Sequence, residues 1–277
     1  YANLAGVIWE IWDLALPLNE TGSTITNYVT FSSVIVDHGS VASKWWSDYV
    51  RYFPGLAYID TQVTPATNQA TMFSAWVRWT GATNGDGSII DGRNAALNAG
   101  IFIGRDTLQK LRVYFAQSDA IYLGWTSTAA LAVNTWYHVA VRKATTGLPI
   151  AYVNGALAAG TYDTGNSDPT TVTVGLNELH IGGALDASSN VVLSWTGEIA
   201  DILYRDAAGT EAEILNIYTR QVPKYAASPA EIERNWYPLL GDVWYDEDTK
   251  YLSRRVVRNA PESCVQIGSQ LYLSPEE

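Results

Sequence analysis

The chain has 277 residues, of which 28 are acidic and 17 are Lys or Arg, so its formal net charge at pH 7 is −11. This surplus of negative charge excludes nucleic-acid binding through clustered basic residues, and no apolar run reaches the roughly 20 residues that membrane insertion requires. A single cysteine, Cys264, excludes an internal disulfide framework, while 11 Trp and 17 Tyr beside only 16% charged residues are typical of β-sheet proteins.

Residues 1–47 form a strand-rich N-terminal extension in our interpretation. Short strands are predicted over 7–12 and 28–36, where aromatic and β-branched residues are concentrated. We find no chemical motif in this stretch. The pattern leaves open whether these strands join the following domain or contact a neighbouring subunit.

Residues 48–222 have the alternation of an antiparallel sandwich. Over 73–79 the apolar residues Phe73, Ala75, Val77 and Trp79 recur at every second position, which places them on one face of a strand. The dipeptide Asn154-Gly155 tolerates the positive φ angles of a type I′ turn and therefore predicts a hairpin. Further strands are predicted over 49–53, 88–91, 99–103, 111–116, 120–125, 136–142, 178–181 and 197–204.

Two capping boxes predict helix starts. In the first, 210–213, the Thr210 hydroxyl is placed to accept from the amide of Glu213 while the Glu213 carboxylate reaches back to the start, and the helix is expected to extend to about Thr219. The second, 228–231, has Pro229 at its first helical position, and that short helix is expected to end before Pro238.

Residues 223–277 form a C-terminal appendage. Short strands at 244–245 and 250–252 flank an acidic turn, and those at 265–267 and 270–273 flank Gly268. Hairpins of this size do not hold a core of their own, so we expect the appendage to lie against the sandwich or another subunit. The candidate assembly contacts are Trp244, Tyr245, Arg254, Arg255 and Arg258.

Six motifs occur in the order seen in one family of sandwiches. They are residues 48–50, 73–77, 134–140, 151–155, 179–183 and 195–204. Together with the helix that Thr210 opens, they resemble LamG-like jelly-roll domains of the concanavalin A-like lectin/glucanase class, including stand-alone copies on phage particles. The resemblance covers residues 48–222. It implies an all-β antiparallel jelly roll with one or two short helices, and a role in binding glycans or proteins.

The sequence lacks the pattern of catalytic carboxylates that glycosidases of this fold class use. Retaining glycosidases need two carboxyl groups about 5 Å apart, which alternate positions on a strand supply. The carboxylates of Glu198 and Asp201 are three positions apart, so simple alternation points them to opposite faces. The three histidines, His38, His138 and His180, are scattered, and we interpret His138 as structural. The sequence therefore predicts that the chain is not an enzyme.

Polar loops and nearby aromatic residues are the remaining candidates for a ligand site. Asp and Asn oxygens in loops are ligands that Ca²⁺ prefers, although such residues are also common turn formers. The weak calcium candidates are Asp163, Asn166 and Asp168, and no other metal or cofactor is predicted. The ligand-binding candidates are Trp79, Asp86, Asp91, Asp119, Tyr122 and Trp125. For the aromatic residues of this set, packing in the core is the alternative role.

Two functions are compatible with these features. In the first, the chain is a structural surface component of a large assembly, such as a capsid decoration or tail protein of a phage virion. Its partners would then be further copies of the chain or other capsid and tail proteins. In the second, it is a secreted or surface-attached module that binds glycans, with or without calcium. Both place the protein on a virion surface or outside the cell, and neither involves nucleic acid or membrane insertion.

Overall fold

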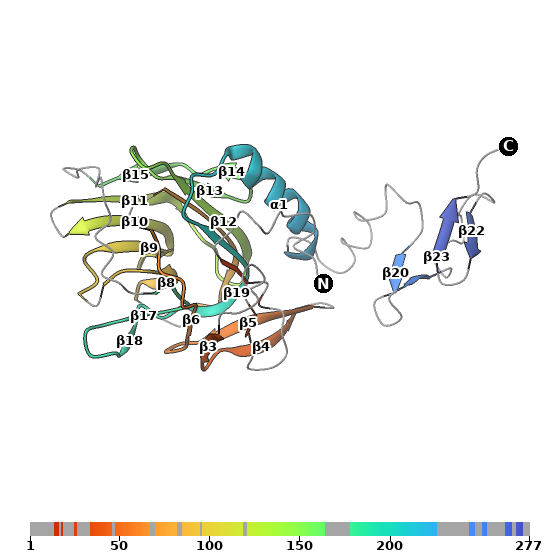
Figure 1. The fold of residues 1–277 in the computed structure, drawn as a ribbon, viewed down its shortest axis with the longest axis horizontal. Coiled ribbons are helices and arrows are strands. Elements are labelled where there is room, and N and C mark those ends of the chain that lie inside the picture. Colours follow the sequence, from red (N-terminus) through yellow and green to blue (C-terminus); the bar gives the residue numbers. More distant parts are fainter. Residues whose placement is uncertain are drawn as a thin grey trace. The chain divides into compact units, whose positions relative to one another are not determined.

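The computed structural model describes residues 14–16, 18, 25–26, 34–45, 48–66, 70–81, 85–94, 96–118, 121–163, 178–225, 244–246, 251–253, 264–267 and 270–273. The chain divides into two compact units, Tyr1–Gln221 and Val222–Glu277. The larger unit contains the two sheets of a sandwich (Figure 1). No helix in the described ranges is long and apolar enough to cross a membrane.

One layer of the sandwich is an eight-stranded sheet with the order β14-β13-β12-β7-β19-β5-β4, to which β1 is added by pairing with β19. Its pairings are all antiparallel. The strands are β1 (Leu14–Leu16), β4 (Val41–Trp45), β5 (Asp48–Pro54), β7 (Thr71–Trp79), β12 (Trp136–Lys143), β13 (Ile150–Val153), β14 (Ala156–Leu157) and β19 (Thr196–Arg205).

The other layer is a nine-stranded antiparallel sheet with the order β15-β11-β10-β9-β8-β16-β6-β3-β2. Non-consecutive neighbours in both layers, such as β16 between β8 and β6, are the crossovers of a jelly roll and confirm the predicted fold class. The strands are β2 (Ile25–Thr26), β3 (Val34–His38), β6 (Tyr58–Asp60), β8 (Gly87–Asp91), β9 (Gly100–Arg105), β10 (Lys110–Ser118), β11 (Ile121–Ala130), β15 (Gly160–Tyr162) and β16 (His180–Ile181). A separate hairpin joins β17 (Ala184–Leu185) to β18 (Val191–Val192).

Strands from the N-terminal stretch are hydrogen-bonded into both sheets. β1 pairs with β19, β4 pairs with β5, and β3 pairs with β6. The question that the sequence left open is therefore answered for these strands, which complete the sandwich. The predicted strand over 7–12 lies outside the described residues, as does most of the one over 28–36.

The hydrophobic core lies between the two sheets. On β7 the alternation predicted from the sequence is confirmed, because Phe73, Ala75, Val77 and Trp79 all belong to the central cluster and are at most 2% exposed. From the facing sheet, β9 and β10 contribute side chains of the same periodicity. Those side chains are Ile101, Ile103, Leu111, Val113 and Phe115. Inward-facing apolar residues of both sheets therefore form one continuous core.

Helix α1 (Glu211–Tyr225) begins at the first predicted capping box. The amide of Glu213 donates to the Thr210 hydroxyl at 3.2 Å, and the amide of Thr210 donates to the Glu213 carboxylate at 2.7 Å. The helix continues past Thr219 to Tyr225, further than the sequence predicts. The second capping box, 228–231, lies outside the described residues.

Two isoleucines attach α1 to the outer face of the eight-stranded sheet. Ile214 and Ile217 pack in a second cluster with side chains of β7, β12, β13 and β19. Its other members are Met72, Ala140, Tyr152 and Leu203. The helix therefore covers the outer face of the eight-stranded sheet (Figure 1).

The smaller unit, Val222–Glu277, contains the two hairpins that the sequence predicts. One pairs β20 (Trp244–Asp246) with β21 (Tyr251–Ser253), and the other pairs β22 (Cys264–Ile267) with β23 (Gln270–Leu273). The division of the chain at 47/48 and 222/223 into functional domains remains a prediction.

Candidate functional site

A row of directly paired residues crosses six strands of the nine-stranded sheet. From β11 to β6 it contains Gly124, Tyr114, Phe102, Asp91, His180 and Asp60. Residues that pair directly across antiparallel strands have their side chains on the same face. Their sequence neighbours Leu123, Val113 and Ile181 are buried in the sandwich, so the row faces outward.

An open pocket of about 340 Å³ lies at the β11 end of this row. Strands β9, β10 and β11 form its floor, and the loop after β8 and the segment before β19 contribute to its wall. Its lining residues are Asp86, Arg93, Leu97, Phe102, Arg112, Tyr114, Tyr122 and Leu193. Aromatic rings combined with a few polar groups are the usual lining of small-ligand sites, and this volume is at the lower end of their range.

Aromatic rings make up much of the floor of the pocket. The rings of Tyr114 and Tyr122 lie 4.9 Å apart between centroids, at an interplanar angle of 35°. Both tyrosines are partly exposed, and Phe102 pairs directly with Tyr114 on the neighbouring strand. The sheet therefore presents adjacent rings at the surface, where a ligand with an apolar face can pack on them.

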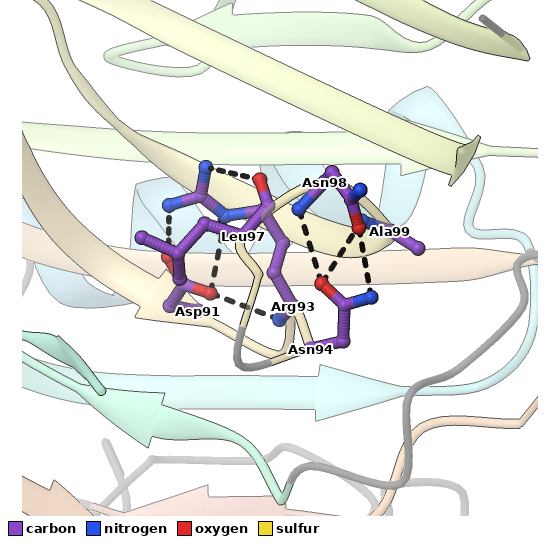
Figure 2. A network of polar contacts seen from close by, with 6 residues as sticks. All are labelled: Asp91, Arg93, Asn94, Leu97, Asn98 and Ala99. Carbon is purple, nitrogen blue, oxygen red and sulfur yellow. Dashed lines mark hydrogen bonds and ion pairs between the residues drawn. The ribbon is translucent and has the colours of Figure 1, made fainter. Parts of the chain in front are cut away.

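The wall segments 92–94 and 96–99 are held in place by a set of polar contacts (Figure 2). The guanidinium of Arg93 donates to the Asp91 carboxylate, with a shortest distance of 2.6 Å, and also to the carbonyl of Leu97 at 3.3 Å. The Asn94 side-chain oxygen accepts from the amides of Asn98 and Ala99 at 3.0 and 3.3 Å. These contacts fix the position of the Arg93 side chain, which lies 4.5 Å from the centre of the Phe102 ring.

Two charged residues beneath and beside the pocket interact with each other. Burial lowers the pKa of Arg105 to about 10. The nearby carboxylate of Asp86 acts in the opposite direction, because it favours the charged guanidinium of Arg105. The Arg105 guanidinium also lies 3.3 Å from the centre of the Trp79 ring. The two lining residues Asp86 and Arg93 are therefore each near an oppositely charged group.

The far end of the row contains a cluster of ionisable groups. The Tyr58 ring stacks on His38 at 4.2 Å and meets His180 edge-on at 5.5 Å. Glu178 shares a hydrogen bond with Asp60, which raises the pKa of Glu178. Burial lowers the pKa of His180.

The structure brings together some of the predicted ligand-binding residues and separates others. Asp86 and Tyr122 both line the pocket, and Asp91 lies beneath its wall, 2% exposed, where it holds Arg93. Trp79 and Trp125 are 2% and 3% exposed and belong to the core cluster, so their rings pack between the sheets. Asp119 lies outside the described residues.

The predicted calcium and assembly residues fall mostly outside the described ranges. Asp163 is described, and its carboxylate occupies the space where Gly124 has no side chain. Asn166 and Asp168 are not among the described residues. Within those residues, no three His, Cys, Asp or Glu side chains form a group that could hold a metal ion. Of the assembly candidates, Trp244 and Tyr245 lie in β20, and Arg254, Arg255 and Arg258 are undescribed.

Six of the eight lining residues were not identified from the sequence: Arg93, Leu97, Phe102, Arg112, Tyr114 and Leu193. A signal for two of them exists in β10, where Arg112 and Tyr114 alternate with Leu111, Val113 and Phe115. Period-two alternation identifies the outward face of a strand, but it does not show which neighbouring strands complete a site.

The model of the Concanavalin A-like lectin/glucanases superfamily matches residues 54–215. No curated protein sequence matches the chain significantly. Among solved structures, the binding domain of Paraclostridial Mosquitocidal Protein 1 is similar with a TM-score of 0.58 at 10% identity. The binding domain of botulinum neurotoxin DC is similar in complexes with SialylT and with rat synaptotagmin II, each with a TM-score of 0.54, at 13% and 16% identity.

These structures cover 76–77% of this chain, whereas the chain spans 52% of theirs, about half of their length. Identities this low show a likeness in fold alone. The sandwich of this chain is thus similar in fold to these toxin binding domains.

Proposed function

Because this chain belongs to the Concanavalin A-like lectin/glucanases superfamily, we propose that it is a non-catalytic binding protein whose pocket on the nine-stranded sheet holds a saccharide. The observation that carries this proposal is the pair of adjacent rings, Tyr114 and Tyr122, beside the charged side chains of Asp86 and Arg112. A sugar ring has apolar C–H faces that pack on aromatic rings and hydroxyl groups that bond to charged side chains at its edge. The pocket provides both kinds of partner within one sugar-sized volume.

The solved structures support a binding role by analogy of fold. One of the similar toxin domains is described in complex with SialylT and also with a protein, rat synaptotagmin II. Those ligands belong to that domain, and the fold accommodates many unrelated functions. The lining residues of this pocket therefore have to carry the argument for this chain.

The carboxylates of the outer face argue against a glycosidase. Retaining and inverting enzymes hold their two carboxyl groups at least about 5 Å apart, on either side of the scissile bond. Asp60 and Glu178 are instead joined by a hydrogen bond, which leaves no space for a sugar between them. Glu198, a carboxylate considered in the sequence, is 5% exposed and forms an ion pair with Arg78 on the neighbouring strand of the eight-stranded sheet.

We expect replacement of either pocket tyrosine to weaken saccharide binding. Tyr114→Ala or Tyr122→Ala should reduce affinity about ten-fold, equivalent to about 1.4 kcal/mol, because each removes a ring from the floor. The measurement is a glycan array with and without EDTA, which also tests the calcium prediction, followed by calorimetry on any saccharide that binds. Tyr162→Ala is the matched control, since that ring is partly exposed on β15 of the same sheet but does not line the pocket. An array without a bound saccharide under either condition would contradict the proposed function.

A structural role on the surface of a large assembly, such as a virion, is the second candidate function. It is favoured by the unit Val222–Glu277, whose described strands form two separate two-stranded sheets. Isolated hairpins are marginally stable in water, so such a unit gains from contact with another surface. Partner subunits and a location on a virion or outside the cell remain part of this proposal.

Light scattering of the full chain and of a form ending at Tyr225 tests this second candidate. The cut keeps α1 whole and leaves the sandwich unit intact. If the C-terminal unit makes the assembly contacts, the full chain should be an oligomer and the shortened form a monomer. Equal monomeric masses for both would contradict the assembly role and leave the binding role untouched.

A further inference from the structure

The pocket is lined by two cationic side chains whose surroundings differ. Arg93 is engaged by Asp91, which accepts from its side chain at distances of 2.6 to 3.3 Å, and Arg93 also donates to Leu97. Asp86, the acidic residue of the lining, lies within electrostatic range of Arg105. These charges are balanced within the protein, so they contribute little net attraction to a ligand.

Arg112 has no such partner within the described part of the chain. No carboxylate there lies within ion-pair distance of its guanidinium, and its side chain makes no hydrogen bond with a described residue. The residue is half-buried on β10, two positions from Tyr114, and the buried neighbours Leu111 and Val113 hold its backbone in the sheet. The pocket is thus lined by one cation that the described protein groups do not neutralise.

Resting on the proposed saccharide site, we infer that the bound saccharide carries a carboxylate, which pairs with the guanidinium of Arg112 while a sugar ring packs on Tyr114 and Tyr122. The planar guanidinium presents two parallel N–H donors that match a carboxylate in a bidentate pair. The pocket volume of about 340 Å³ accommodates one or two sugar rings. Sialic and uronic acids are the sugars with this combination of groups.

The negative charge of the whole chain does not oppose this pairing strongly. The formal charge of −11 is distributed over a large surface. At physiological ionic strength, exposed charges further away than about 8 Å are largely screened. The ligand therefore responds mainly to the groups that line the pocket, of which Arg112 contributes the unbalanced charge.

The test is calorimetry of the full chain with matched pairs of saccharides: sialyllactose and oligouronates, each beside its carboxyl methyl ester, together with lactose 3′-sulfate. We expect an acidic saccharide to bind at least about ten-fold more tightly than its ester, since the ester loses the ion pair. Arg112→Gln should abolish this preference, weakening the acid by about ten- to a hundred-fold and the ester by little. Arg112→Lys should retain part of the preference, because the charge remains while the planar fork is lost.

Lys110→Gln is the control, because it removes the same charge from the same strand outside the pocket. It should leave the ratio of acid to ester unchanged, and thermal unfolding of every variant should match the unaltered chain. Equal binding of acids and esters, an unchanged ratio in Arg112→Gln, or a preference for the sulfate over the carboxylates would overturn the inference and leave the saccharide site standing. Absence of binding by every saccharide would overturn the proposed function itself.

Discussion

We expect the free energy of unfolding to fall by about 1.4 kcal/mol for each pH unit below about 6.5, owing to one histidine. His138 is fully buried, and burial lowers its pKa to about 3. Its Nε2 lies 2.8 Å from the Ser74 hydroxyl, and its ring contacts those of Trp76 and Tyr218, whose centroids lie 5.4 and 5.6 Å away. None of these three neighbours carries a negative charge that would offset the burial of a charged imidazole.

The direction of this effect follows from proton binding. Between the unfolded pKa of about 6.5 and the folded pKa of about 3, the unfolded chain binds a proton at this histidine and the folded chain does not. The free energy of unfolding is therefore not reduced by His138 above pH 6.5. Below that pH it falls progressively down to about pH 3, by about 4 to 5 kcal/mol in total. A loss of this size is a large share of the stability of a typical domain.

Urea unfolding at several pH values between 7.5 and 4.5, followed by Trp fluorescence, measures this loss. Acidic side chains and His180, whose pKa burial also lowers, contribute to the slope as well, so the comparison is with His138→Gln, which is neutral throughout and should show a flatter dependence. His38→Gln, an exposed histidine of the other sheet, is the control and should keep the slope of the unaltered chain. Parallel pH dependences for the chain and His138→Gln would contradict the prediction.

Gly197→Ala should destabilise the sandwich by about 3 kcal/mol or more, the range expected for a buried residue forced into a clash. Gly197 lies in β19 between its partners Phe53 on β5 and Trp79 on β7, with φ at +145°. A Cβ there would collide with the carbonyl oxygen of Arg78, a backbone atom that cannot move without opening the β7–β19 pairing. The left-handed φ adds strain for any residue with a side chain.

Soluble yield and the urea midpoint of Gly197→Ala are the quantities to measure. Gly85→Ala is the matched control, because a Cβ at that loop position meets no atom within 4 Å and its φ is not in the left-handed region. It should change the free energy of unfolding by no more than about 0.5 kcal/mol. A Gly197→Ala protein as stable as the Gly85→Ala protein would show that β19 relaxes around the added methyl group.

Much of the fold could be predicted because its signals are local. The alternation of Phe73, Ala75, Val77 and Trp79 defines the inward face of β7, and the Asn154-Gly155 dipeptide forms the turn between β13 and β14, with φ angles of 52° and 74°. The capping box at Thr210 likewise depends on residues three positions apart. In each case backbone sterics and side-chain periodicity act within a few residues, so the pattern is visible in the sequence.

The site could be predicted only in part, because it depends on pairing between strands that are distant in the sequence. Asp86 and Tyr122 were identified from their positions near loop ends, whereas Phe102 and Arg112 become pocket residues only through the order of β9, β10 and β11. Trp79 shows the opposite outcome: its place near a loop end made it a ligand candidate, but it is buried in the core, as the alternation along β7 already indicates.

The sequence by itself determined the all-β class, the strand periodicity and the start of α1. The tertiary structure decided that β1, β3 and β4 complete the sandwich and that α1 covers one sheet. It also decided which outward residues meet in one row, such as His180 beside both Asp91 and Asp60. The physical reason is that local conformation is governed by neighbouring residues, whereas the choice of pairing partners minimises the exposed apolar surface of the whole unit.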